Sequence, residues 1–318
     1  LTPGPSPPEG RGEQGAGPLP PGTFTPEGGG ESIRTITFTG DIGRKEVPIL
    51  RDPSPIPPAD LIISESTYGG RSHPGIEMLA EELLAVIQRT VERGGKLMIP
   101  AFSMGRTQTI LFHLHQLIDT GKLRPLPIYV DSPLSAAATE VFRLHPECFD
   151  EETSMLLYRE RDLFGERLVH FTRTVEESKA INQVSIPCII IAASGMCETG
   201  RIVHHLKYNL EDPRNTVLII GYQAPETLGR RIVEKRPFVR IHNREVALRA
   251  EVAVLNGFSG HAGRDDLLAM LSPLAAPTRK LRLVHGEVDQ AEALLATLKE
   301  RGFVDAAIPD RGESVTLD

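Results

Sequence analysis

Residues 96–106, KLMIPAFSMGR, contain the pattern that decides the fold: an apolar run, a short turn ending in glycine, and the start of an amphipathic stretch. The apolar run predicts a strand over 96–100, and the amphipathic stretch predicts a helix over 106–119. The same unit recurs after residue 34. Further strands are predicted over 36–39, 60–64, 127–130, 188–193, 216–221, 251–255 and 281–285, and further helices over 75–92, 136–142, 201–206, 264–271 and 290–300. This alternation is typical of an α/β fold with largely parallel strands.

The composition allows a two-domain protein, because 318 residues with 40% hydrophobic content can form one large core or two ordinary ones. The sequence shows neither an apolar run long enough to span a membrane nor a signal-peptide pattern, so the cytoplasm is the expected location. The net charge of −7 would repel RNA, so any RNA contact requires a local basic patch or a metal. The three cysteines form no C-x-x-C pair, which predicts buried free thiols. More than half of residues 1–31 are Gly or Pro, and we expect segment 1–32 to be disordered.

Two acidic residues follow predicted strands, at the end of an α/β sheet where ligands usually bind. Asp41 lies between two glycines in the sequence GDIGR, where its carboxylate suits a metal ligand and a helix cap or turn equally well. Glu65 lies in SESTYG, where it can orient a histidine or cap the following turn. Taken singly, each acid is most simply explained as a cap or turn.

Two histidines occupy similar positions. His261 in GFSGHA and His285 in LVHGE lie at or just past the ends of apolar strands. A single histidine at such a place is most often a satisfied polar residue. Two of them on the same rim as Asp41 and Glu65 favour a metal or acid–base site.

Loops rich in Gly and Ser precede several of the predicted helices, where exposed backbone N–H groups suit phosphate, although tight turns need glycine for geometry alone. A basic cluster near residue 230 is either a nucleic-acid path or an ordinary solvated face. Candidate phosphate or RNA contacts are Ser103, Arg106, Ser194, Gly195, Arg230, Arg231 and Ser259. By contrast, His113 and His115 stand two apart in a predicted helix and therefore point to different faces, so we do not expect them to bind one metal.

In order along the chain, these motifs resemble those of β-CASP proteins of the metallo-β-lactamase fold. The resemblance rests on FTGDIGR, ESTYG, IPAFSMGRTQ, YVDSPL, ASGM, GYQ with GRR, GFSGHA and VHGE, and it covers the chain from about Ile33 onward. It implies a partial metallo-β-lactamase αββα domain with an inserted β-CASP α/β domain. We expect residues 33–70 and 238–318 to form the first domain and residues 71–237 the second.

The resemblance also implies a dinuclear zinc hydrolase that acts on RNA phosphodiesters. By motif match, Asp41 would bridge the two metals and His285 would be a further metal ligand. Glu65 would hydrogen-bond His261, which would act at the scissile phosphate or the leaving oxygen.

The sequence departs from the family pattern in one respect. Family members carry an H-x-H-x-D-H loop before the aspartate motif, whereas no histidine precedes His73 here. We therefore expect an N-terminally truncated member with an incomplete zinc site, weak or no activity, and an uncovered apolar sheet face that lowers solubility or requires a partner. The alternative is a non-catalytic RNA-binding or scaffold protein, as a homodimer or paired with an active homologue. A nucleotide-binding enzyme is disfavoured, because neither a G-x-G-x-x-G nor a P-loop motif is present.

Overall fold

The computed structural model describes residues 33–160, 162–165, 167–276 and 279–317. The expectation for segment 1–32 lies outside these residues. Within them, no helix combines the length and the apolar character that a membrane crossing needs.

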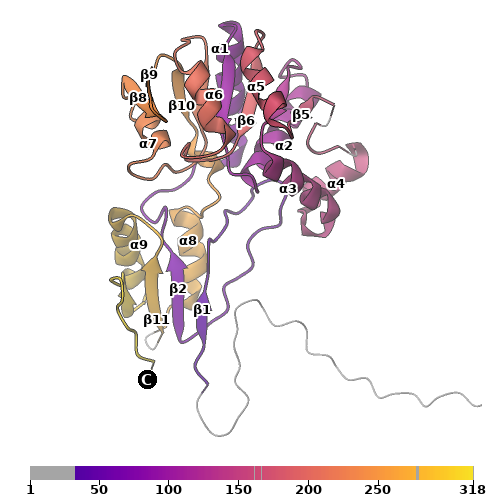
Figure 1. Ribbon diagram of the computed structural model, residues 1–318. Coiled ribbons are helices and arrows are strands. Elements are labelled where there is room, and N and C mark those ends of the chain that lie inside the picture. Colours follow the sequence, from indigo (N-terminus) through magenta and orange to yellow (C-terminus); the bar gives the residue numbers. More distant parts are fainter. Residues whose placement is uncertain (1–32, 161, 166, 277–278, 318) are drawn as a thin grey trace, which may run out of the picture.

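The smaller of the two main layers is a four-stranded parallel sheet in the order β1-β2-β11-β12 (Figure 1). Its strands are Ile36–Phe38 (β1), Leu61–Glu65 (β2), Lys280–Val284 (β11) and Asp305–Ala307 (β12). Helices α8 (Arg264–Leu271) and α9 (Val288–Glu300) pack against it. Their core includes Ile62, Leu281 and Leu283 from the strands, and Leu268 and Leu294 from the helices.

Strand β1 leaves apolar side chains uncovered at the edge of this sheet. Side chains two apart on a strand share a face, so Ile36 and Phe38 lie on the same side of β1. Both are exposed, Phe38 by 66%. The structure therefore exposes these two apolar side chains at the sheet edge, and the wider uncovered face expected from the sequence stays a prediction.

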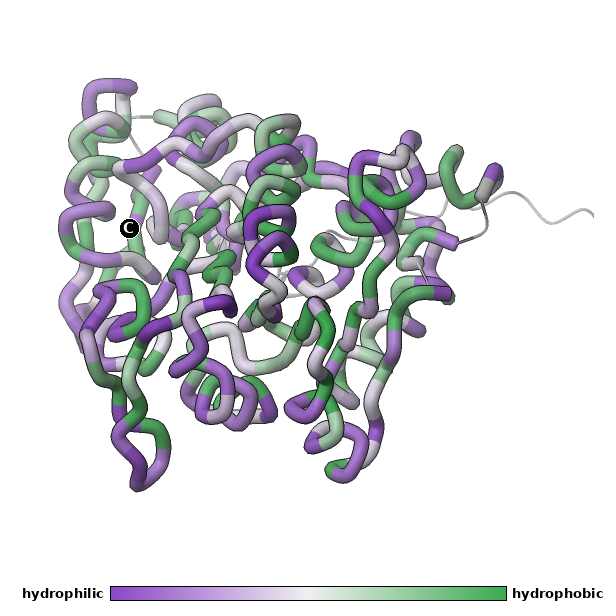
Figure 2. The backbone as a smooth tube through the Cα atoms, turned by 90° about the horizontal axis from the view of Figure 1, so that it is seen from above, coloured by the Kyte–Doolittle hydropathy of each residue, from purple (hydrophilic) through white to green (hydrophobic). Residues whose placement is uncertain are grey.

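The larger layer is a six-stranded parallel sheet in the order β10-β7-β3-β6-β4-β5. It is covered on both faces, because alternate residues of its strands, apart from the edge strand β5, pack into two different cores. Leu97 and Ile99 join the core that includes α1 and α2, whereas Met98 joins the core that includes α6 and α7. Figure 2 shows hydrophobic and hydrophilic residues mixed along the helices, as helices with one buried face require.

The strands of this layer are Lys96–Pro100 (β3), Ile128–Val130 (β4), Val169–Phe171 (β5), Cys188–Ala192 (β6), Thr216–Ile219 (β7) and Glu251–Val254 (β10), with Phe238–Ile241 (β8) and Arg244–Ala247 (β9) forming a separate hairpin. The helices are Ile76–Glu92 (α1), Arg106–Asp119 (α2), Pro133–Leu144 (α3), Glu151–Glu160 (α4), Val175–Gln183 (α5), Arg201–Asn209 (α6) and Leu228–Val233 (α7).

A buried carboxylate at the end of β4 ties several of these elements together. Asp131 accepts hydrogen bonds from Ser178 (2.5 Å), Arg201 (2.7 Å), His205 (2.7 Å) and Thr172. Burial raises the pKa of this carboxyl, but the four hydrogen bonds outweigh burial and hold the pKa well below its usual range.

The structure differs from the sequence expectations at two places. Residues 238–254 pack with the larger layer: β10 pairs with β7, and Val239 and Val246 lie in the core of α6 and α7. We therefore propose a boundary after Val254 rather than at residue 238. Cys148 is exposed, unlike the other two cysteines, because it lies in a short surface turn before α4.

Candidate metal centre

Four side chains from distant parts of the sequence converge at one edge of the smaller sheet. Asp41, Glu65, His261 and His285 each place a ligand atom within 4.8 Å of the others. Asp41 follows β1, Glu65 ends β2 and His285 follows β11, so the parallel strand order itself brings three of the four together. His261 arrives on the loop after β10. The sequence prediction that these four residues share one rim is confirmed.

Glu65 is the hub of this cluster, with a side chain only 1% exposed. Its Oε1 accepts the backbone N–H of Ile42 at 2.5 Å, which fixes the loop that carries Asp41. Its Oε2 accepts the Thr67 hydroxyl at 2.7 Å and lies 3.0 Å from His261 Nδ1. One buried carboxylate thus orients three parts of the site.

The hydrogen bond that His261 donates to Glu65 sets the chemistry of the ring. A carboxylate only accepts, so Nδ1 carries the proton of that bond and Nε2 is left for a substrate. The hydrogen bond to Glu65 raises the pKa of His261, and it outweighs the opposing effect of burial. The protonated ring is therefore favoured, as a proton donor requires.

His285 and Asp41 are the accessible pair, and both side chains are more than half exposed. His285 Nδ1 lies 3.8 Å from Asp41 Oδ1 and 3.1 Å from Thr67 Oγ1. The backbone of His285 adopts φ +52°, a conformation that L-residues rarely take. The adjoining loop is close-packed, because a Cβ on Gly286 would lie 2.5 Å from Ser66 Oγ.

Thr67 is a member of the site that sequence reasoning missed. Its hydroxyl stands between Glu65 and His285, whose backbone carbonyl also lies 2.9 Å away. The sequence placed Thr67 in a motif but gave no sign of this role, because its second neighbour is 218 residues away.

The donor set fits zinc in kind. Imidazole nitrogen and carboxylate oxygen are zinc ligands, and Asp41 and His285 present such atoms to solvent. Glu65 is already engaged by three hydrogen bonds, which suits a residue that orients a ligand or an acid rather than one that binds the metal.

Three of the candidate phosphate contacts lie beside His261. Arg106, Gly195 and Ser259 line a cavity of about 60 Å³ together with His261 and residues that follow β3, β6 and β7. The carboxyl ends of the larger sheet therefore face this site. Burial lowers the pKa of Arg106 to about 10, and among the described residues no carboxylate pairs with it. Its guanidinium donates instead to the carbonyl oxygen of Phe258.

The other four candidates are engaged elsewhere. Ser103 Oγ is buried and lies 3.1 Å from Ser132 Oγ, and Ser194 Oγ accepts the N–H of Thr199 at 3.4 Å. The two arginines of α7 also have local partners: Arg230 pairs with Glu234 at 3.0 Å, and Arg231 donates to the carbonyl of Glu226. A role for these four in RNA binding stays a prediction.

The two helical histidines are not part of the cluster. Both lie on α2, and the ring of His113 packs edge-on against Phe258. Burial lowers the pKa of His113 to about 4, so the ring is neutral at physiological pH.

Comparison with known proteins identifies the family to which the chain is similar. Residues 107–232 match the model of the Beta-Casp domain, and residues 245–309 match that of the Zn-dependent metallo-hydrolase RNA specificity domain. A protein named ribonuclease from Thermus thermophilus is 39% identical over 95% of this chain and 68% of its own length. An RNase J-like protein of Methanocaldococcus jannaschii is 31% identical, over 88% of this chain and 64% of its own length. The transcription termination factor FttA of Methanosarcina mazei is also 31% identical, and the chain spans only 44% of it.

Proposed function

The chain belongs to the β-CASP family of metallo-β-lactamase-fold RNA hydrolases, and on this premise we propose that it acts in the zinc-dependent hydrolysis of RNA phosphodiesters. The observation that carries the proposal is the convergence of Asp41, Glu65, His261 and His285 within 4.8 Å. The relatives named ribonuclease and RNase J-like support the choice of RNA. We further propose that the reaction takes place in the cytoplasm.

Asp41 and His285 would hold the metal, because their ligand atoms are the accessible ones. Zinc, when bound, supplies Lewis acidity toward a phosphate oxygen. As a water molecule attacks the phosphorus and the P–O bond to the leaving ribose breaks, His261 would deliver a proton from Nε2 to the leaving oxygen. Glu65 keeps the ring oriented and favours its protonated form. Arg106 offers a cation to the phosphate from the neighbouring cavity.

The number of ligands limits what these residues do alone. A zinc ion commonly takes four ligands, and Asp41 and His285 provide two. We therefore expect the 318-residue chain to bind zinc weakly and to cut RNA slowly.

The test is cleavage of a labelled RNA by the chain in excess zinc. We expect slow cleavage that stops with a chelator and falls by at least about a hundredfold in His261→Ala, in line with the loss of a general acid. The matched control is His204→Ala, which removes an exposed histidine on α6. Intact RNA at zinc concentrations that saturate the site would contradict the proposal, and so would equal cleavage by the His261 and His204 variants.

One observation favours a second candidate, a non-catalytic RNA-binding partner of an active homologue. The half-buried Arg106 lines the cavity beside His261 and has no carboxylate partner among the described residues, and it needs no metal to attract phosphate. RNA binding that weakens steeply with salt but never leads to cleavage, even in excess zinc, would support this candidate.

A further inference from the structure

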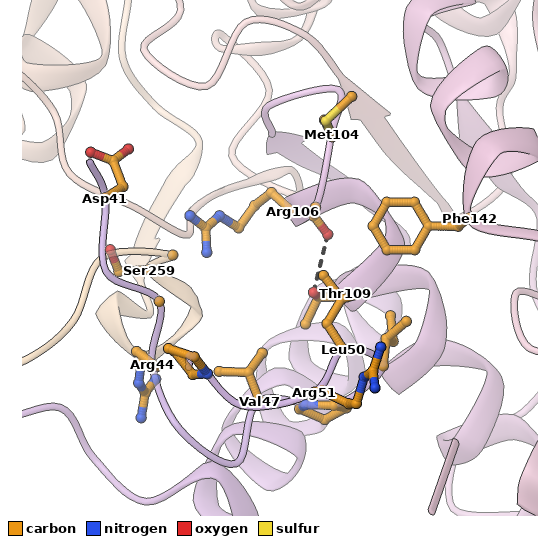
Figure 3. A pocket seen from close by; sticks show the side chains of 16 residues that line it. Asp41, Arg44, Val47, Leu50, Arg51, Met104, Arg106, Thr109, Phe142 and Ser259 are labelled. Atoms are coloured by element: carbon orange, nitrogen blue, oxygen red, sulfur yellow. Dashed lines mark hydrogen bonds between the residues drawn. The ribbon is translucent and has the colours of Figure 1, made fainter. Parts of the chain in front are cut away.

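A second, larger cavity opens beside the metal centre. Its volume is about 480 Å³, and Asp41 and Ser259 lie on the side that it shares with the metal centre (Figure 3). Gly260 also lines the cavity. Val47 and Leu50 form one side, and Met104 and Phe142 approach from the other. The cavity is thus continuous with the metal centre at one end and apolar at the other end.

The lining is strongly biased toward positive charge. Three arginines and a single carboxylate, that of Asp41, line the cavity. Arg44 and Arg106 donate to the backbone carbonyls of Gly257 and Phe258. Arg106 has no ion-pair partner in the part of the chain that the structure describes, and Arg44 has only the longer-range attraction of Asp266. The third, Arg51, is exposed at the rim. Cations held by neutral carbonyls keep their charge available to an anion.

The apolar end is firmly built. Leu50 forms a bridge with Phe149, and the N–H of Ile49 donates to Thr153 Oγ1 at 3.2 Å, so the segment that carries Val47 and Leu50 is anchored to α4 and the turn before it. Phe142 packs edge-on against the buried ring of Phe164, with ring centroids 6.4 Å apart. Figure 3 shows the Phe142 ring pointing into the cavity.

A nucleotide, whose flat base is joined to a phosphate, matches this cavity in shape and charge. The volume also fits, because sites of about 300–1,000 Å³ accept small ligands. Nucleic-acid-binding proteins hold unpaired bases on aromatic and apolar side chains, while arginines contact the phosphates. We propose that this cavity receives one unpaired nucleobase of the RNA strand, next to the phosphate that lies at Asp41 and His285. The inference rests on the proposed function and assigns this cavity to one base of the strand.

The test uses the full chain, a chelator to prevent cleavage, and fluorescence anisotropy at low salt. The probes are a labelled five-nucleotide RNA and five versions that each lack one base. The variants are Met104→Glu and its matched control Met155→Glu, which makes the same change on α4. Both methionines are exposed, by 67% and 50%, so neither change should unfold the protein.

We expect loss of one particular base to weaken binding by about tenfold in the native chain and in Met155→Glu. In Met104→Glu the intact RNA should bind more weakly. Removal of the same base should then lower the binding affinity by less than about twofold, because the base no longer enters the cavity. An unchanged base effect in Met104→Glu would overturn the inference. RNA that binds with no base effect at any position would overturn it too, and so would no binding of any RNA. Neither result bears on the proposed function, because the chelator removes the zinc on which the cleavage test depends.

Discussion

The central prediction concerns the replacement Glu65→Gln, which keeps the shape of the buried side chain but removes its charge. Glutamine has one acceptor oxygen, whereas Glu65 uses both of its oxygens to accept from Ile42, Thr67 and His261. If the glutamine oxygen keeps the bond to Ile42, its amide group faces Thr67 and His261. The Thr67 hydroxyl can turn to the carbonyl of His285 at 2.9 Å, but His261 Nδ1 then faces another donor.

The magnitude follows from the hydrogen bonds that are lost. A hydrogen bond to a charged group contributes about 1.5–3 kcal/mol, and the Thr67 bond is partly replaced, so the free energy of unfolding should fall by about 2–3 kcal/mol. This corresponds to roughly 1 M in the urea midpoint. The pKa of His261 is raised in the folded protein, so its contribution to stability is fully present below about pH 6.5 and is lost as the pH rises through the folded value. The difference between native chain and variant should therefore be larger at pH 6 than at pH 9.

The assay is urea unfolding followed by circular dichroism at both pH values. The matched control is Glu81→Gln, the same change on the exposed face of α1. Zinc affinity, measured by competition with a chromophoric chelator, should also fall by about 10- to 100-fold, as when the partners that orient metal ligands are removed. An unchanged urea midpoint in Glu65→Gln would refute the view that Glu65 holds the site together.

Three further predictions test other parts of the molecule. The pKa of Asp131 is lowered in the folded state, so its contribution to stability is present above the unfolded pKa of about 4 and is lost as the pH falls through the folded pKa. In denaturation curves the native chain should therefore be more stable than Asp131→Asn at pH 7 and should lose this advantage below about pH 4. A constant advantage down to pH 2 would be inconsistent with this prediction. In Gly286→Ala, a Cβ would meet Ser66 at 2.5 Å and displace His285, so zinc affinity should fall by at least about tenfold, whereas Gly75→Ala, which meets nothing within 4 Å, should keep it. Phe38→Thr should reduce binding of a hydrophobic dye and increase solubility while stability stays within about 0.5 kcal/mol; light scattering that shows equal aggregation would contradict the role of the uncovered face.

The sequence predicts the long, apolar elements well, because periodicity reports burial directly. Strand β3 and helices α2 and α8 have the predicted bounds, and the other predicted strands differ by only one or two residues at an end. The sequence prediction missed strands β5, β8, β9 and β12 and helices α4, α5 and α7. Of these, β5 and β12 have three residues each and include polar or small side chains. Such strands are defined by their neighbours in the sheet rather than by their own composition.

The four residues of the centre are predictable for a different reason. Asp41, Glu65 and His285 follow strands, and parallel strands bring their carboxyl ends to one edge. The position of Thr67 is not predictable in this way, because its function depends on a contact with His285 across the sheet. Ser103 shows the opposite case, since a loop rich in small residues suggested phosphate binding while the fold turns its hydroxyl toward Ser132.

The loop from Gly257 to His261 has a consequence for how recognition and reaction are related. Its first two carbonyls hold Arg44 and Arg106, and its last residue is the imidazole that Glu65 orients. An RNA phosphate that binds Arg106 would therefore weaken its hydrogen bond to Phe258, which lies in the same short loop that positions His261. In the proposed reaction, phosphate contact and the orientation of His261 are therefore coupled through this loop.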